Sequence, residues 1–129
     1  MPITETTAPL YAIKAELFRS LAHPTRIQVL EVLSAAADHS APVSSLLGTT
    51  GVEASVLSQH LAVLKRAGVV TSARTGNTVV YRLSRPLVAD LLVVARAFLR
   101  ETLSESGARL AAADDLPALP DAHVGGGTP

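Results

Sequence analysis

The side chains best suited to chemistry lie on one face of a helix expected over about residues 53–67. Leu57, Leu61 and Leu64 recur at helical spacing and predict the buried face of that helix. The other face then carries small polar side chains, with two basic residues at its end: Ser55, Ser58, Gln59, Lys65 and Arg66. Gln can pair bidentately with adenine, Ser can bond several bases, and Lys and Arg bind phosphates. This pattern indicates contact with DNA, and the alternative is an ordinary solvated helix face.

A shorter helix is expected just before this one. It covers about residues 43–47 and is ended by Gly48, after which Thr49-Thr50-Gly51 predicts a tight turn. Gly68 stands where a C′ glycine would end the longer helix. A short helix, a glycine-containing turn and a longer helix together predict a helix-turn-helix.

β-Branched residues predict a β-hairpin directly after the longer helix. Residues 69–74 and 78–83 are rich in Val and Thr, and Gly76-Asn77 between them offers the positive φ that a tight turn needs. Polar and basic side chains on this hairpin suit contact with phosphates or the minor groove: Arg74, Thr75, Asn77 and Arg82. The alternative is an ordinary polar turn.

The basic residues are concentrated in the middle of the chain. Lys plus Arg number 11 and Asp plus Glu number 11, so the formal net charge is zero. Residues 54–100, however, carry seven Lys and Arg against Asp90 alone, and acidic residues predominate on both sides. A polyanion responds to such a local patch rather than to the total charge. Arg26, on the second helix described below, is a weaker candidate for a phosphate contact.

Apolar spacing predicts three further helices. Leu10, Ile13, Leu17 and Leu21 mark a helix that starts near Pro9, and Pro24 fits the first turn of a second helix. The last helix, over about residues 86–104, has apolar side chains on nearly all of its faces. A terminal helix in so small a protein cannot bury them all against its own chain, which predicts a second copy as partner.

Composition excludes several function classes. With no cysteine among 129 residues, the chain has no disulfide, no zinc finger and no thiol redox switch. No nucleophilic side chain lies at a recognisable catalytic spacing from a general base in the sequence, so an enzyme is not expected. No signal peptide or membrane span is expected, and a cytoplasmic protein without a membrane partner is predicted.

Residues 1–8 are expected to be flexible, residues 9–104 to form the domain, and residues 105–129 to be a disordered tail.

Three segments in this order resemble the ArsR/SmtB family of bacterial repressors: LFRSLAHPTRIQVLEVLS (17–34), VLSQHLAVLKRAGVV (56–70) and RTGNTVVYRLS (74–84). The resemblance covers about residues 10–103. It implies a mainly α fold with a small β-hairpin, a winged helix-turn-helix, and a homodimer formed through the first and last helices. The implied function is repression by sequence-specific binding to palindromic operator DNA. The alternative is a winged-helix module that binds another protein and has no DNA specificity.

The resemblance also suggests roles for particular residues. His60 lies in a Ser-x-His-Leu stretch that belongs to the DNA-facing element of the family, and the alternative is a half-buried packing histidine. The expected dimer interface uses apolar side chains of the first and last helices: Leu10, Ile13, Leu17, Leu87, Leu91, Val94 and Phe98.

Family members release DNA when they bind a metal, an oxidant or another small signal, but this sequence departs from the metal patterns. Val43-Ser44-Ser45-Leu46 stands where the cysteine pair of thiolate sensors is expected. Asp90 could begin the last-helix metal site, yet Leu92 and Leu103 stand where its histidines should be. Weak ligand candidates remain in Asp38, His39 and His123. The sequence therefore leaves three alternatives for the effector. They are a regulatory metal ion such as nickel, cobalt or zinc, an apolar molecule in the dimer groove, and an effector-sensing partner protein.

Overall fold

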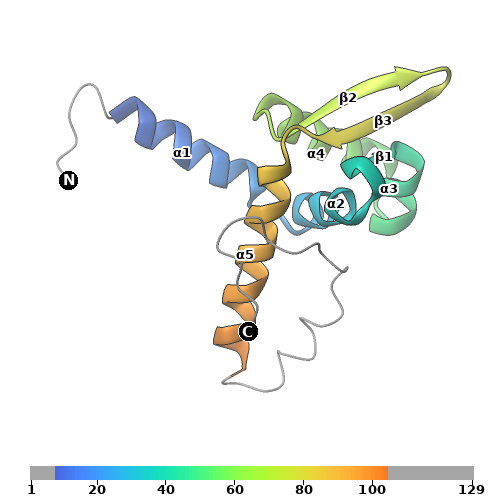
Figure 1. Cartoon of the computed structure of the whole chain (residues 1–129). Helices are drawn as coiled ribbons and strands as arrows, with labels where there is room; N and C mark the ends of the chain where they lie inside the picture. Colours follow the sequence, from blue (N-terminus) through green and yellow to red (C-terminus); the bar gives the residue numbers. More distant parts are fainter. Residues whose placement is uncertain (1–7, 105–129) are drawn as a thin grey trace.

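A helix-turn-helix followed by a β-hairpin forms the centre of the computed structural model, which describes residues 8–104 (Figure 1). Two more α-helices precede this unit and one follows it. In chain order the elements are α1 (Ala8–Leu21), α2 (Pro24–Ala35), a short 3-10 helix (Ala37–His39), β1 (Ser40–Pro42), α3 (Val43–Thr50), α4 (Ala54–Arg66), β2 (Val70–Thr75), β3 (Thr78–Leu83) and α5 (Pro86–Leu103). The expected winged helix-turn-helix is confirmed. Ala8 already belongs to α1, and the predictions for residues 1–7 and 105–129 lie outside the described residues.

The core is built around α2. Val29, Leu30 and Leu33 are completely buried, and α2 contacts α3, α4, α5, β1 and β3. From α4, the three leucines of the expected stripe complete the same core, since Leu57, Leu61 and Leu64 are all buried. Each such leucine contributes roughly 1.5–3 kcal/mol of transfer free energy on burial. This packing fixes which face of α4 remains outside.

The wing is the β2–β3 hairpin, as the sequence predicted. Thr75 pairs with Thr78, which leaves Gly76-Asn77 as a two-residue loop. Gly76 has a φ of 63°, while Asn77 is not among the positive-φ residues. Glycine alone therefore supplies the left-handed conformation, at the first loop position that a type II′ hairpin requires.

A third strand, β1, was not expected from the sequence. It pairs antiparallel with β3, with Ser40 opposite Arg82 and Pro42 opposite Val80. Three residues are too few to show an alternating pattern, and proline is tolerated because β1 is an edge strand. Positive φ values at Asp38 and His39 turn the chain into this strand.

The expected end of α3 at Gly48 is wrong. The helix continues to Thr50 and ends at Gly51, whose φ is 71° and whose N–H donates to the Leu47 carbonyl at 2.9 Å. Gly48 is tolerated inside the helix because tertiary packing outweighs a propensity cost of about 1 kcal/mol. By contrast, Gly68 does end α4, as predicted: it has a φ of 75°, and its N–H donates to the Lys65 carbonyl at 3.0 Å.

Alanine substitutions at Gly68 and Gly48 should have opposite effects on the free energy of unfolding. Gly68→Ala forces a side chain into the left-handed region and should lower the free energy of unfolding by about 1 kcal/mol. Gly48→Ala should raise it by up to about 1 kcal/mol, since the site is helical and a new Cβ meets no atom within 4 Å. Urea unfolding of both variants measures this, and a change of the same sign in both would contradict the assignment.

Candidate DNA-binding surface

The outer face of α4 carries the polar row that the leucine spacing predicted. With Leu57 and Leu61 buried, Ser55, Ser58 and Gln59 are exposed to solvent. No helix or strand of residues 8–104 covers these three side chains. Their hydrogen-bonding groups are therefore available to a ligand outside the protein.

A hollow of about 420 Å³ with a mixed polar and apolar lining separates this helix from the wing. Ser58 of α4 and Asn77 of the wing both line it, so the structure brings together two residues that the sequence placed on separate elements. Ser44 of α3 and Thr78 of β3 also line it, and neither was expected from the sequence. Apolar side chains such as Val43 and Val79 complete the lining, which among the described residues offers hydroxyl and amide groups and no charged side chain. Such groups can hydrogen-bond a phosphodiester without repelling it.

The basic residues at the end of α4 point to two different neighbours. Lys65 Nζ donates to Ser72 Oγ at 2.8 Å, which places it over β2. Arg66 lies instead beside a second hollow that Arg19 and Arg26 also line, and Arg19 is ion-paired with Glu16 there. Three arginines therefore border one surface depression, although α1, α2 and α4 each supply only one of them. The contribution of Arg19 could not be seen from the sequence, since only the fold brings α1 to α4.

His60 contacts α2. Its Nδ1 lies 3.2 Å from Arg26 Nη1, and its ring lies 4.2 Å from the His23 ring, centroid to centroid. Because arginine can only donate, the Nδ1 of His60 must accept, and the imidazole must then be neutral. Burial lowers the pKa of His60 below the ordinary histidine value, and the neighbouring His23 and Arg26 lower it further. The packing role considered for His60 agrees with these contacts.

The wing separates its polar residues by position. Arg74, Thr75 and Asn77 are exposed at or beside the tip. Arg82 lies toward the other end of β3, where its Nη2 donates to Asp38 Oδ2 at 2.7 Å. Arg82 therefore does not share the tip with the other three residues.

The expected metal candidates do not come together among residues 8–104. No group of three or more His, Cys, Asp or Glu in this range could hold a metal ion. Asp38 is engaged by Arg82, and His39 adjoins it in the chain. His123 lies outside the described residues. Within the same range, no helix combines the length and apolar character needed to cross a bilayer.

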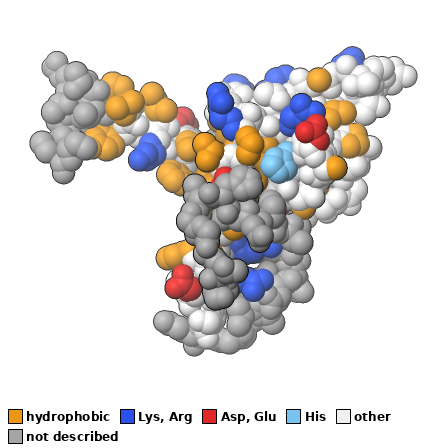
Figure 2. Space-filling model, viewed as in Figure 1, with side chains coloured by type: hydrophobic (Ala, Val, Ile, Leu, Met, Phe, Trp, Pro, Cys, Tyr) orange, Lys and Arg blue, Asp and Glu red, His pale blue; other side chains and the backbone are white. Residues whose placement is uncertain are grey.

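Apolar side chains remain uncovered along α1 and α5. The α1 helix extends away from the other elements (Figure 1), and hydrophobic side chains follow its surface (Figure 2). Leu10, Ile13 and Phe98 are 63%, 65% and 63% exposed. Leu17, Leu87 and Val94 are exposed as well, whereas Leu91 is partly buried against the core. Such a large uncovered apolar surface is typical of an interaction face.

The helix-turn-helix α3–α4, held on α2, together with the wing and the exposed polar row defines a winged helix-turn-helix DNA-binding protein. A sequence-family description, "Helix-turn-helix domain", matches residues 21–73. The chain belongs to the ArsR/SmtB family of helix-turn-helix transcriptional regulators.

Three relatives illustrate this membership. The uncharacterized HTH-type transcriptional regulator Rv0081 of Mycobacterium tuberculosis is 47% identical over 111 residues, which are 85% of this chain and 92% of the relative. Its crystal structure matches with a TM-score of 0.68 over 76% of this chain and 96% of that chain. The transcriptional repressor SmtB of M. tuberculosis is 39% identical over 82 residues, 64% of this chain and 58% of the relative.

The third relative is the homodimeric winged helix-turn-helix domain of Mb0332 from Mycobacterium bovis, described as a possible ArsR-family regulator. It is 26% identical, with a TM-score of 0.69 over 80% of this chain and 93% of that chain.

The lowered pKa of His60 predicts a pH dependence of stability. Below about pH 6.5 the unfolded chain binds a proton at this residue before the folded chain does. The stability that neutral His60 contributes is thus present above that pH and is lost as the pH falls. Unfolding free energies from pH 8 to 5 should decline less steeply in His60→Asn, whose amide oxygen can still accept from Arg26. Identical slopes in the two proteins would contradict this.

Proposed function

We propose that two copies of this chain bind a palindromic operator and repress transcription, with α4 of each copy in a major groove. The observation that carries this proposal is the exposed row of Ser55, Ser58 and Gln59 on a helix held by its buried leucines. Gln59 is the residue best suited to base recognition, because its amide can donate and accept at one adenine. The two serines suit shorter contacts to neighbouring bases.

The surrounding residues would hold the DNA backbone. The hollow between α4 and the wing suits one phosphodiester, through the polar groups of Ser44, Ser58 and Asn77. Lys65 and Arg66 are positioned for further phosphates at the end of α4, and Arg26 lies beside Arg66. Arg74 and Thr75 at the wing suit phosphate or minor-groove contact. Arg82 is the weakest member of the set, since its guanidinium already bonds Asp38.

Dimerisation would follow from the uncovered faces of α1 and α5. One recognition helix reads only a few base pairs, whereas two related by a two-fold axis read half-sites about one helical turn apart. The homodimeric state of the Mb0332 domain supports this arrangement. Ile13, Phe98 and their exposed neighbours are the side chains that would become buried.

The effector proposed for this repressor is a small molecule rather than a metal held on α5. Asp90 and Leu92 are both buried toward the core, and Leu92 offers no ligand atom. The donor set therefore does not fit the last-helix metal site that the family resemblance implied. A regulatory metal would need His123 together with Asp38, His39 or groups of a second copy.

Two substitutions on α4 separate base recognition from phosphate binding. Gln59→Ala should cost about 1–3 kcal/mol on the operator and little on unrelated DNA. Lys65→Ala should weaken both DNAs alike and reduce the slope of log K against log salt by about one. Fluorescence anisotropy with DNA from upstream of its own gene measures both effects.

Unchanged operator affinity in both variants would overturn the proposed reading of DNA. In that case the alternative of a protein-binding module without DNA specificity becomes the leading account, with α1 and α5 as its interaction face.

A charge on α1 should separate the two copies. Ile13→Glu places a carboxylate on the uncovered face, where it costs little in the single chain but strongly opposes burial in a dimer. Sedimentation should show a monomer, and operator affinity should fall at least tenfold. Ala37→Glu, at an exposed site in the 3-10 helix, serves as the control. A dimer that persists in Ile13→Glu would contradict the assignment of α1 to the interface.

A further inference from the structure

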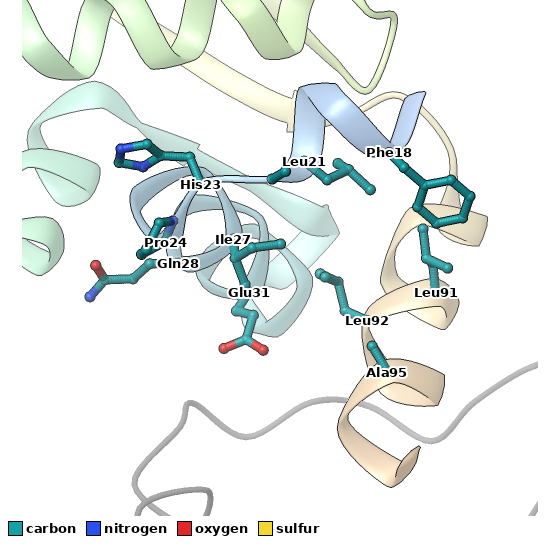
Figure 3. A pocket seen from close by; sticks show the side chains of 11 residues that line it. Phe18, Leu21, His23, Pro24, Ile27, Gln28, Glu31, Leu91, Leu92 and Ala95 are labelled. Atoms are coloured by element: carbon teal, nitrogen blue, oxygen red, sulfur yellow. The ribbon is translucent and has the colours of Figure 1, made fainter. Parts of the chain in front are cut away.

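A groove of about 740 Å³ lies between the end of α1, the start of α2 and the middle of α5 (Figure 3). Phe18 and Leu91 face each other at one end, and Leu92 and Ala95 continue the α5 wall. Ile27 forms part of the opposite wall on α2. The size and the mainly apolar lining are those of a small-molecule site, for which roughly 300–1,000 Å³ is typical.

One carboxylate interrupts this apolar lining. Glu31 projects from α2 below Ile27 (Figure 3), and its residue is only 5% exposed. Among the described residues, the lining also holds His23 but neither Lys nor Arg, and Glu31 is its only carboxylate. A carboxylate removed from water in this way requires a nearby cation or hydrogen-bond donors.

Arg96 of α5 supplies only part of that requirement. Its Nη2 lies 3.3 Å from Glu31 Oε1, yet neither Nη2 nor Nε of Arg96 makes a hydrogen bond within the described structure. The pair is therefore an electrostatic contact rather than a bidentate, hydrogen-bonded one. Since a carboxylate has about four acceptor positions, Glu31 retains capacity for a donor that enters from the groove.

We propose that this groove binds an organic cation with an apolar body, such as a primary alkyl or arylalkyl amine. The ammonium group would donate to Glu31, and the apolar body would lie along Ile27, Phe18 and Leu91. Charge complementarity selects this class over a fatty acid, whose carboxylate would face Glu31, and over a neutral alcohol, which brings no charge.

The position of the groove couples a ligand bound in it to the DNA-binding surface. α5 belongs to the proposed dimer face, whereas α2 packs against α3 and α4. The Glu31–Arg96 contact joins these two parts, and an ammonium group at Glu31 competes with Arg96 for the same carboxylate. This consequence rests on the proposed function. When the amine displaces Arg96 from Glu31, it acts as an effector that changes the spacing of the two recognition helices and weakens operator binding.

Calorimetric titration of the full chain at pH 7 with octylamine, 1-octanol and octanoate tests the site without DNA. Octylamine, kept below its micelle concentration, should bind at least tenfold more tightly than the other two. Glu31→Gln should abolish that preference, and circular dichroism confirms that the variant is folded. Because Glu31→Gln leaves Arg96 buried without its partner, Ala95→Trp provides a second variant, which fills the groove and should eliminate octylamine binding.

Three outcomes would overturn the proposal. They are equal binding of the three compounds, no binding of octylamine, or unchanged octylamine binding in a folded Ala95→Trp. A dimer that dissociates in Ala95→Trp, without octylamine binding in the parent chain, would show that a second copy fills the groove. Operator binding without octylamine is measured separately, so failure of the repressor assignment leaves the amine site standing, and the reverse also holds.

Discussion

The whole structure depends on the burial of α2. This helix has Leu30, Leu33 and Val29 completely buried, and it also buries the polar residues Glu31 and Ser34. Its neighbours therefore surround it on several sides: α3 and α4 of the helix-turn-helix, the sheet, and α5. Because α4 is held against α2 through its leucines, the direction of its polar face is a consequence of hydrophobic packing. The proposed recognition helix and the proposed dimer face are therefore both connected to this one helix.

Neutral net charge does not conflict with DNA binding in this architecture. The fold collects basic side chains from α4, the wing and the neighbouring ends of α1 and α2, while Arg19 and Arg82 are each paired with an acidic residue. The hydrogen-bonding groups that line the hollow beside the wing are neutral hydroxyl and amide groups. The proposed affinity therefore depends on a local surface of moderate charge, and specificity depends on the serines and Gln59. Such a surface should be sensitive to salt without binding every polyanion.

The sequence predicted those parts of the fold whose signals are local. Leu57, Leu61 and Leu64 oriented α4, Gly76 marked the hairpin turn, and Gly68 marked the end of α4. What it missed depends on residues distant in the chain. β1 exists through pairing with β3 some 40 residues later. The contacts of Glu31 with Arg96 and of His60 with Arg26 and His23 likewise require packed helices. The prediction that α3 ends at Gly48 was wrong because the helix-propensity penalty of glycine, about 1 kcal/mol, is smaller than the packing free energy that keeps α3 helical.

In the proposed function, two copies read a two-fold symmetric DNA site through α4. The most direct measurement is the stoichiometry and specificity of binding to DNA from upstream of its own gene, determined by analytical ultracentrifugation at two salt concentrations. We expect two chains per duplex on the intact palindrome. Binding should be much weaker when one half-site is scrambled, and the affinity should fall as salt rises. One chain per duplex, or equal affinity for a fully scrambled duplex, would contradict the proposed function.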